Sequence, residues 1–203
     1  MSRYRGPKVK IIRRFGQQLP GLTRKSEKLR TNPPGQHGQR RGRPTVYGER
    51  LREKQKLRLN YGISEKQMRR YMVKSKQRRG DAGKNLLSFL EGRLDNVVFR
   101  LGFAPTNPAA RQLVSHNHIL VNGRKVNIPS YQLKAGDQVT LKDKSKKMEY
   151  VLSSLSQPSL DMPSYLSYDE KEMVGEYKNW PEREDTPLDI QENLIVEFYS
   201  GVV

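Results

Sequence analysis

The chain of 203 residues contains no cysteine. This absence excludes disulfide bonds and any zinc site built from thiolates. No hydrophobic run approaches the roughly 18 residues that span a bilayer, and the start lacks the apolar centre of a signal peptide. We therefore expect a soluble protein in a reducing compartment, or in one whose redox state does not affect it.

Recognisable catalytic patterns are also lacking. There is no phosphate loop, no dinucleotide fingerprint, no serine elbow and no carboxylate pair in an apolar setting. His116 and His118 could share a metal ion, but no carboxylate or thiol stands at a supporting spacing. Histidines that face phosphate or are satisfied by ordinary hydrogen bonds are favoured instead. We expect a protein that is not an enzyme, with no catalytic residue, no metal and no cofactor.

Apolar residues are scarce and positive charge is in excess. Hydrophobic residues make up 34% of the chain, below the roughly 45–50% of ordinary globular proteins. The 39 Lys and Arg outnumber the 21 Asp and Glu, for a net charge of +18 and a pI of about 10.2. Such a charge repels itself and favours a polyanionic partner, against which part of the chain would become ordered.

The charge is unevenly distributed. Residues 1–90 hold 26 Lys and Arg and 5 Asp and Glu, a net of +21. Residues 91–152 hold 10 and 5, and residues 153–203 hold 3 and 11, so that the end of the chain is acidic. The N-terminal half is expected to meet the polyanion, and the acidic part to face solvent, a basic neighbour or its own basic half.

Residues 93–141 contain the clearest pattern. Leu94, Val97, Val98 and Leu101 have the spacing of one buried helical face, and Gly102 ends that helix. The pattern predicts a short core helix at the start of a compact module.

A second helix is predicted directly afterwards. Asn107 can cap it, and Pro108 suits the first helical position. The inward face is Ala110, Leu113 and Val114. Arg111 and Gln112 are then expected to point outward, and Asn117 is expected to end the helix in the left-handed conformation.

A strand pair is predicted to follow, with residues 119–121 and 124–126 joined by Asn122-Gly123, a dipeptide typical of a type I′ hairpin. Arg111, His116, His118, Arg124 and Lys125 would then lie close together, an arrangement suited to gripping phosphates. The alternative is that these are ordinary solvated charges on a small α+β module.

The N-terminal half is predicted to begin irregularly. Gly and Pro recur too often in residues 1–44 for long helices, and residues 32–38 (NPPGQHG) form a turn-rich hook that could present His37 and backbone amides to phosphate. A disordered basic tail is the alternative. Residues 46–60 are predicted to be helical, with a basic side formed by Arg50, Lys54, Lys56 and Arg58.

A very basic helix is predicted next. Ser64 and Gln67 form a capping box, and the apolar stripe is limited to Met68, Tyr71 and Met72. Like charges repel along the rest of its surface, so the helix is better explained by docking on nucleic acid than by a solvated face.

Residues 81–92 are predicted to be a core helix, residues 142–147 a basic loop and residues 148–155 a short helix. Residues 193–199 (NLIVEFY) are predicted to form a terminal strand.

Several of these blocks resemble the S-four family of small-subunit ribosomal proteins. They are MSRYRGPK, PPGQHG, EKQKLR with YGISEKQ, LLSFLEGRLDNVVFRLGF, AARQLVSHNHILVNGRKVNIPSYQLKAGD and NLIVEFYS. The resemblance covers essentially the whole chain. It is closest to the cyanobacterial and plastid branch and, since the chain has no cysteine, departs from relatives with a four-cysteine zinc site.

The resemblance implies an α+β fold, with a basic N-terminal extension and helical domain, followed by a small α/β RNA-binding module of two helices and a short antiparallel sheet. The expected parts are residues 1–91, with a terminal strand at about 193–203 packing back on them, the module at 92–153, and an acidic segment at 154–203.

The function implied is that of a structural constituent of the small ribosomal subunit. Such a protein clamps a multi-helix junction in the 5′ domain of the rRNA, nucleates assembly of the subunit body and contributes to translational accuracy. Implied neighbours are small-subunit proteins five, three and twelve and mRNA on the side where it enters, with no membrane and no small-molecule substrate. The plastid stroma is the favoured compartment, and the bacterial or cyanobacterial cytoplasm is the alternative.

Residues expected to contact rRNA are the basic side chains of the extension, the helices and the module. They are Arg3, Arg5, Lys8, Lys10, Arg13, Arg14, Arg24, Lys25, His37, Arg40, Arg41, Arg43, Arg50, Lys54, Lys56, Arg58, Arg69, Arg70, Lys74, Arg111, His116, His118, Arg124 and Lys125.

Two other functions remain open at this point. One is an RNA-modifying enzyme or assembly factor that uses the same module to hold RNA, although residues 1–90 are too basic and too broken by Gly and Pro for a catalytic core. The other is a basic protein that compacts DNA.

Overall fold

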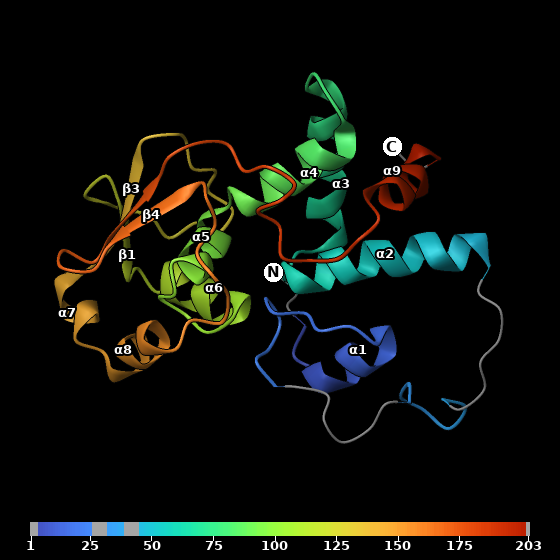
Figure 1. Cartoon of the computed structure of the whole chain (residues 1–203), viewed down its shortest axis with the longest axis horizontal. Helices are drawn as coiled ribbons and strands as arrows, with labels where there is room; N and C mark the ends of the chain where they lie inside the picture. Colours follow the sequence, from blue (N-terminus) through green and yellow to red (C-terminus); the bar gives the residue numbers. More distant parts are fainter. Residues whose placement is uncertain (1–3, 26–31, 39–44, 202–203) are drawn as a thin grey trace. The chain divides into compact units, whose positions relative to one another are not determined.

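The structure is a computed structural model that describes residues 4–25, 32–38 and 45–201. In these residues it contains nine helices and five strands, so the predicted α+β class is confirmed. The chain divides into two compact units (Figure 1). Unit 1 takes the chain up to Gly83 and again from Leu188, and unit 2 is Lys84–Pro187. No helix in the described ranges is both long and apolar enough to cross a membrane.

Unit 1 is helical. Its elements are α1 (Lys8–Phe15), α2 (Val46–Asn60), α3 (Glu65–Gln77) and α9 (Glu192–Ser200). The predicted helices at 46–60 and from Ser64 are confirmed, including the capping box of Ser64 with Gln67. The predicted apolar stripe of α3 is also confirmed, since Met68, Tyr71 and Met72 are all buried.

The prediction that residues 1–44 are irregular is wrong for residues 8–15, which form the short helix α1. Ile11, Ile12 and Phe15 are buried on one face of this helix. Gly16 then ends it with a positive φ of 61°, and its N–H donates to the Ile12 carbonyl. A helix of only two turns is stable here because its single apolar face is buried by tertiary packing and a glycine caps its C-terminus.

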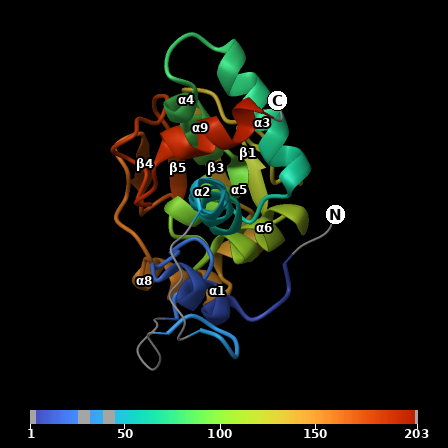
Figure 2. The ribbon, with the colours of Figure 1, turned by 90° about the vertical axis from the view of Figure 1, so that its right-hand side faces the viewer.

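The predicted terminal strand is also wrong, because residues 192–200 form helix α9. Its buried residues, Ile195 and Tyr199, are four apart, which is the spacing of a helix face. β-branched and aromatic residues favour a strand only as a weak preference, and packing overrides it here. The helix packs on α2 and touches α3, as Figure 2 shows.

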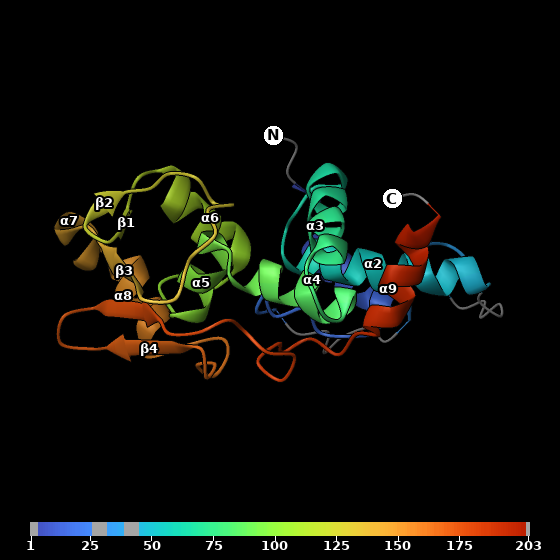
Figure 3. The same ribbon diagram turned by 90° about the horizontal axis from the view of Figure 1, so that it is seen from above.

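Unit 2 contains a five-stranded sheet and the remaining helices. The helices are α4 (Ala82–Glu91), of which the residues from Lys84 belong to this unit, α5 (Leu94–Arg100), α6 (Asn107–Ser115), α7 (Asp143–Lys146) and α8 (Glu149–Ser156). The strands are β1 (Ile119–Val121), β2 (Arg124–Lys125), β3 (Asp137–Leu141), β4 (Leu166–Asp169) and β5 (Val174–Tyr177). They are antiparallel, in the order β2-β1-β3-β5-β4 (Figure 3).

The predicted helices and hairpin of unit 2 are confirmed, but the prediction of a loop at residues 142–147 is wrong, because residues 143–146 form the one-turn helix α7. Asn122 and Gly123 both have positive φ, 49° and 75°, as a type I′ turn requires. Asn117 has a φ of 63° just beyond α6. The N-cap of α6 is Thr106 and not Asn107, which is already helical.

Strands β4 and β5 were not predicted. They join the sheet through pairing of β5 with β3, for example Val139 with Gly175. A Cβ at Gly175 would overlap the side chain of Leu101, so a larger residue there would require Leu101 to move. The first part of the acidic C-terminal segment is therefore integral to unit 2, and its last part forms α9 in unit 1.

A buried ion pair fixes the start of α5. Arg93 is 0% exposed and donates two hydrogen bonds to Asp95, of 2.9 Å from Nε and 2.6 Å from an Nη. Next to it, Glu91 accepts hydrogen bonds from Tyr165 (2.7 Å) and Asn96 (2.6 Å). Charged side chains are stable in an apolar interior only when they are paired and hydrogen-bonded, as these are.

Candidate nucleic-acid interface

The predicted contact residues are divided between the two units. Arg3, Arg40, Arg41 and Arg43 lie outside the described residues. Unit 2 carries Arg111, His116, His118, Arg124 and Lys125. Unit 1 carries the other fifteen: Arg5, Lys8, Lys10, Arg13, Arg14, Arg24, Lys25, His37, Arg50, Lys54, Lys56, Arg58, Arg69, Arg70 and Lys74.

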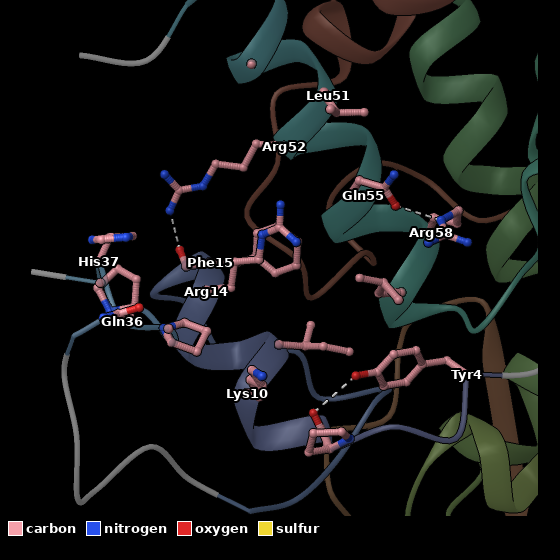
Figure 4. Close-up of a pocket in the computed structure, with 18 residues that line it drawn as sticks. Tyr4, Lys10, Arg14, Phe15, Gln36, His37, Leu51, Arg52, Gln55 and Arg58 are labelled. Carbon is pink, nitrogen blue, oxygen red and sulfur yellow. Dashed lines mark hydrogen bonds between the residues drawn. The ribbon is translucent and has the colours of Figure 1, made fainter. Parts of the chain in front are cut away.

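In unit 1, a cavity of about 1030 Å³ lies between α1, the hook and α2 (Figure 4). Arg13 holds the hook to α1 by donating two hydrogen bonds to the Asn32 carbonyl, 2.9 and 3.2 Å long. Arg52 joins α2 to α1 through a 2.6 Å hydrogen bond to the Phe15 carbonyl. Predicted residues Lys10, Arg14, His37 and Arg58 are thus brought together around one hollow.

Sequence reasoning missed Arg52, Tyr4 and Gln55, which also line this cavity. A usable signal was present for α2. Its lining positions 48, 51, 52, 55, 58 and 59 are spaced by three and four residues, the repeat of one helical face.

Helix α3 presents a second basic surface in unit 1. Arg69, Arg70 and Lys74 are exposed, opposite the buried Met68 and Met72. The apolar stripe thus orients the basic side of the helix toward solvent.

Three predicted contact residues of α2 are instead paired with carboxylates. Lys54 was expected on the exposed side, but it is only 5% exposed and donates to Glu65 at 3.0 Å. Lys56 pairs with the buried Glu53 at 2.6 Å, and Arg50 pairs with Glu197 at 2.7 Å. Acidic residues of α2, α3 and α9 thus pair with these three positions. The exposed position expected for Lys54 is wrong, and contact of the three residues with rRNA stays a prediction.

The buried Lys54 belongs to a small network. Its ammonium lies 4.4 Å from the centre of the Phe198 ring, and Tyr199 donates a 2.7 Å hydrogen bond to Glu65. Burial alone would raise the pKa of Glu65, but the hydrogen bonds from Tyr199 and Lys54 and the charges of Lys54 and Arg58 outweigh it and lower the pKa. Burial, the hydrogen bond to Glu65 and the charge of Glu65 raise the pKa of Tyr199.

Replacing Tyr199 by Phe is expected to lower the free energy of unfolding by about 1–2 kcal/mol at pH 7, because a hydrogen bond to a charged, partly exposed group is lost. The pKa of Glu65 is lowered in the folded state, so its contribution is present above the unfolded value near 4.5 and disappears as the pH falls through the folded pKa. Urea titrations at pH 7 and pH 3 should show the difference between variant and parent shrinking in acid. Tyr47→Phe, at an exposed tyrosine, is the control and should leave the free energy of unfolding unchanged at both pH 7 and pH 3.

In unit 2, the predicted residues lie at the end of α6 and on the first hairpin. His116, Arg124 and Lys125 are exposed, and His118 is partly buried with its Nδ1 2.9 Å from the Ser145 hydroxyl. The rings of His116 and His118 are nearly parallel, with centroids 6.4 Å apart. Burial, followed by the charges of His116 and Lys142, lowers the pKa of His118. His118 is therefore neutral near pH 7 and offers a hydrogen bond instead of a charge.

No three His, Asp or Glu side chains gather as metal ligands in the described parts of the chain.

Arg111 does not point outward as predicted, since it is only 7% exposed. Arg111 lies next to the apolar stripe of α6, and the apolar stem of an arginine can be buried at such a position.

Arg111→Ala is therefore expected to lower the free energy of unfolding by about 2–4 kcal/mol, through lost packing and partners left unsatisfied. In a thermal melt this corresponds to a fall of roughly 4–16 °C. Arg124→Ala, on the exposed hairpin, is the matched control and should melt with the parent. Equal melting of both variants would show that Arg111 is not structural.

Comparison with known proteins gives consistent results along the chain. Residues 3–91 match the family model of the ribosomal protein S4/S9 N-terminal domain, and residues 92–139 match that of the S4 domain. Small ribosomal subunit protein uS4 of a Synechococcus strain is 55% identical over 201 residues, covering 98% of each chain. The uS4 protein of Thermosynechococcus vestitus is 52% identical over 204 residues and 100% of both chains. Small ribosomal subunit protein uS4c of Cyanophora paradoxa is 51% identical, covering 98% of this chain and 100% of its own.

Proposed function

This chain belongs to the ribosomal protein S4 family, and from that membership we propose that it is a structural constituent of the small ribosomal subunit that binds the rRNA directly. Full-length similarity to relatives named as small-subunit proteins carries the proposal. The exposed cations of both units give it a physical basis. Since its relatives bear ribosomal-protein names, a structural role is favoured over an enzymatic one.

The mechanism we infer is recognition of RNA shape. A-form RNA conceals the base edges of its major groove, so Arg and Lys that contact phosphates and 2′-hydroxyls select an arrangement of helices and not a sequence. The strongly basic residues 1–90 and the exposed cations of the first hairpin, on one chain, suit such a clamp. We propose that residues 1–91 and the module at 92–153 each grip RNA at one multi-helix junction of the 5′ domain.

The same proposal extends to the position in the subunit. By family membership, the protein would bind early, nucleate the subunit body and contribute to translational accuracy. Its neighbours would be small-subunit proteins five, three and twelve, with mRNA on the side where it enters. The relatives from cyanobacteria and from Cyanophora paradoxa support the plastid stroma or a cyanobacterial cytoplasm as the compartment.

Sedimentation tests this function. The protein should cosediment with small ribosomal subunits in an extract and should leave that fraction after ribonuclease treatment. In a binding competition at equal salt, structured small-subunit rRNA should displace it far better than duplex DNA. A protein found free of ribosomes, or displaced equally by DNA, would refute the proposal.

A further inference from the structure

We propose that the cavity between α1, the hook and α2 receives an unpaired nucleotide of the RNA, with the base against the apolar floor and the phosphates against the cations at the rim. This inference rests on the proposed function, since it identifies what one part of the interface binds. It differs from backbone clamping because it requires a base that is not in a duplex.

The charge of the cavity is of one sign. Lys10, Arg14, Arg52 and Arg58 line it, and its described lining residues include no Asp or Glu. Two of these cations are held in position: Arg52 by the Phe15 carbonyl at 2.6 Å and Arg58 by Gln55 at 2.7 Å. Guanidinium groups held in this way can bind phosphate through their remaining N–H groups without first losing conformational freedom.

The floor of the cavity is apolar. Ile11 and Phe15 of α1 and Leu51 and Leu59 of α2 contribute to it. Clusters of cations that serve only to bind a phosphate backbone need no such floor. Apolar and cationic side chains that line one cavity match the two halves of a nucleotide, a planar base and a charged phosphate.

The aromatic ring of Tyr4 also lines the cavity. Tyr4 is 49% exposed and its hydroxyl donates weakly to the Pro7 carbonyl at 3.4 Å. The ring lies against Gly6, where a Cβ would come within 2.6 Å of the tyrosine hydroxyl. A half-exposed ring placed in this way can stack on a base.

The wall opposite α2 is compact. The Gly38 N–H donates to the Gly35 carbonyl at 3.2 Å, which closes the turn of the hook. A Cβ at Gly38 would overlap the Pro33 carbonyl, so only glycine fits there. Together with the Arg13 hydrogen bonds, this turn fixes the hook beside α1.

The size of the cavity limits its ligand. At about 1030 Å³ it is at the upper end of the roughly 300–1000 Å³ typical of small-ligand sites. A base within a duplex is stacked on both faces and could not reach the floor.

Fluorescence can test the site with the full chain. The probe is a six-nucleotide single-stranded RNA with 2-aminopurine at its centre, whose emission should change on binding and saturate. Gln55→Glu adds one negative charge beside Arg58 while keeping a hydrogen-bond acceptor, and should weaken binding about tenfold. Gln18→Glu makes the same change at an exposed residue outside the cavity and should bind like the parent.

A second pair of variants tests the stacking surface. Tyr4→Ala should weaken probe binding roughly 5- to 100-fold, the range for loss of one stacked base, and Tyr4→Phe should restore it. A probe with an abasic centre should lose affinity by a similar factor on the parent protein. Inorganic phosphate and a blunt-ended RNA duplex should compete poorly.

The outcomes separate this inference from the proposed function. If Gln55→Glu and Gln18→Glu bind the probe equally, or if the abasic probe binds as well as the intact one, the nucleotide site is refuted. Filter binding of small-subunit rRNA to the parent protein would then still support the proposed function. Failure of the parent to bind that rRNA refutes the proposed function and, with it, this inference.

Discussion

Binding of small-subunit rRNA should weaken by roughly 10³- to 10⁵-fold when salt rises from 50 to 200 mM, the range for proteins that neutralise six to ten phosphates. We expect the exposed Lys and Arg of α1, α3 and the first hairpin to be the source of this dependence. Each bound phosphate releases counterions, and added salt opposes their release. Filter binding across a salt series measures the slope directly.

A pair of arginine variants tests which cations contribute to the salt dependence of rRNA binding. Arg70→Ala removes an exposed guanidinium and should reduce the salt slope by about one. Arg50→Ala removes one that pairs with Glu197 at 2.7 Å and should change the slope much less. Both variants lower the net charge by one, so a difference between them reflects local contact with phosphate. A flat salt response of the parent would contradict a phosphate-dominated interface.

Asp95→Asn should destabilise the protein by about 3–5 kcal/mol, because it leaves the guanidinium of Arg93 buried without its counter-charge. The Asp95 side chain is only 4% exposed and receives two hydrogen bonds from Arg93, besides one from the Asn96 backbone. It also lies in the first turn of α5, where negative charge is favourable. Urea unfolding followed by circular dichroism measures the loss.

Asp143→Asn is the matched control. This carboxylate is fully exposed, and its distance of 3.9 Å to the Lys146 ammonium nitrogen is long for an ion pair. It should leave the unfolding midpoint unchanged within error. If Asp95→Asn unfolds at the same midpoint as the control, the Arg93 charge is compensated by other groups and the ion pair does not fix the start of α5.

Elements with local signals were predictable from the sequence. Ser64 and Gln67 specify the start of α3 through mutual hydrogen bonds, and Asn122-Gly123 specifies the hairpin through its positive φ angles. Each depends on residues within four positions of one another. Conformational preferences of that range act before any tertiary contact forms.

Elements that depend on distant partners were not predictable in the same way. Strand β5 pairs with β3 more than thirty residues earlier in the chain, and no short pattern in the acidic segment specifies that neighbour. Helix α9 has the composition of a strand and becomes helical where α2 covers its apolar face. For such segments, tertiary burial outweighs intrinsic preference.

The candidate site shows the same limit. The sequence identifies which residues are positive, but not which of them are neutralised within the fold. Lys54 meets Glu65, eleven residues away, and Arg50 meets Glu197 at the other end of the chain. Arg111 is buried although its position next to the apolar stripe of α6 predicted exposure. In contrast, Lys10 and Arg14 remain exposed because no described carboxylate pairs with them.

The return of the chain to unit 1 through α9 reverses the usual order of maturation on the synthesising ribosome. Domains generally fold from the N-terminus as they emerge. Here Lys84–Pro187 can complete its interior while the earlier unit still lacks Ile195 and Tyr199. Stalled nascent chains that carry residues 1–190, followed by a flexible linker long enough to clear the ribosome's exit tunnel, should therefore resist protease across the later unit and remain sensitive in the first.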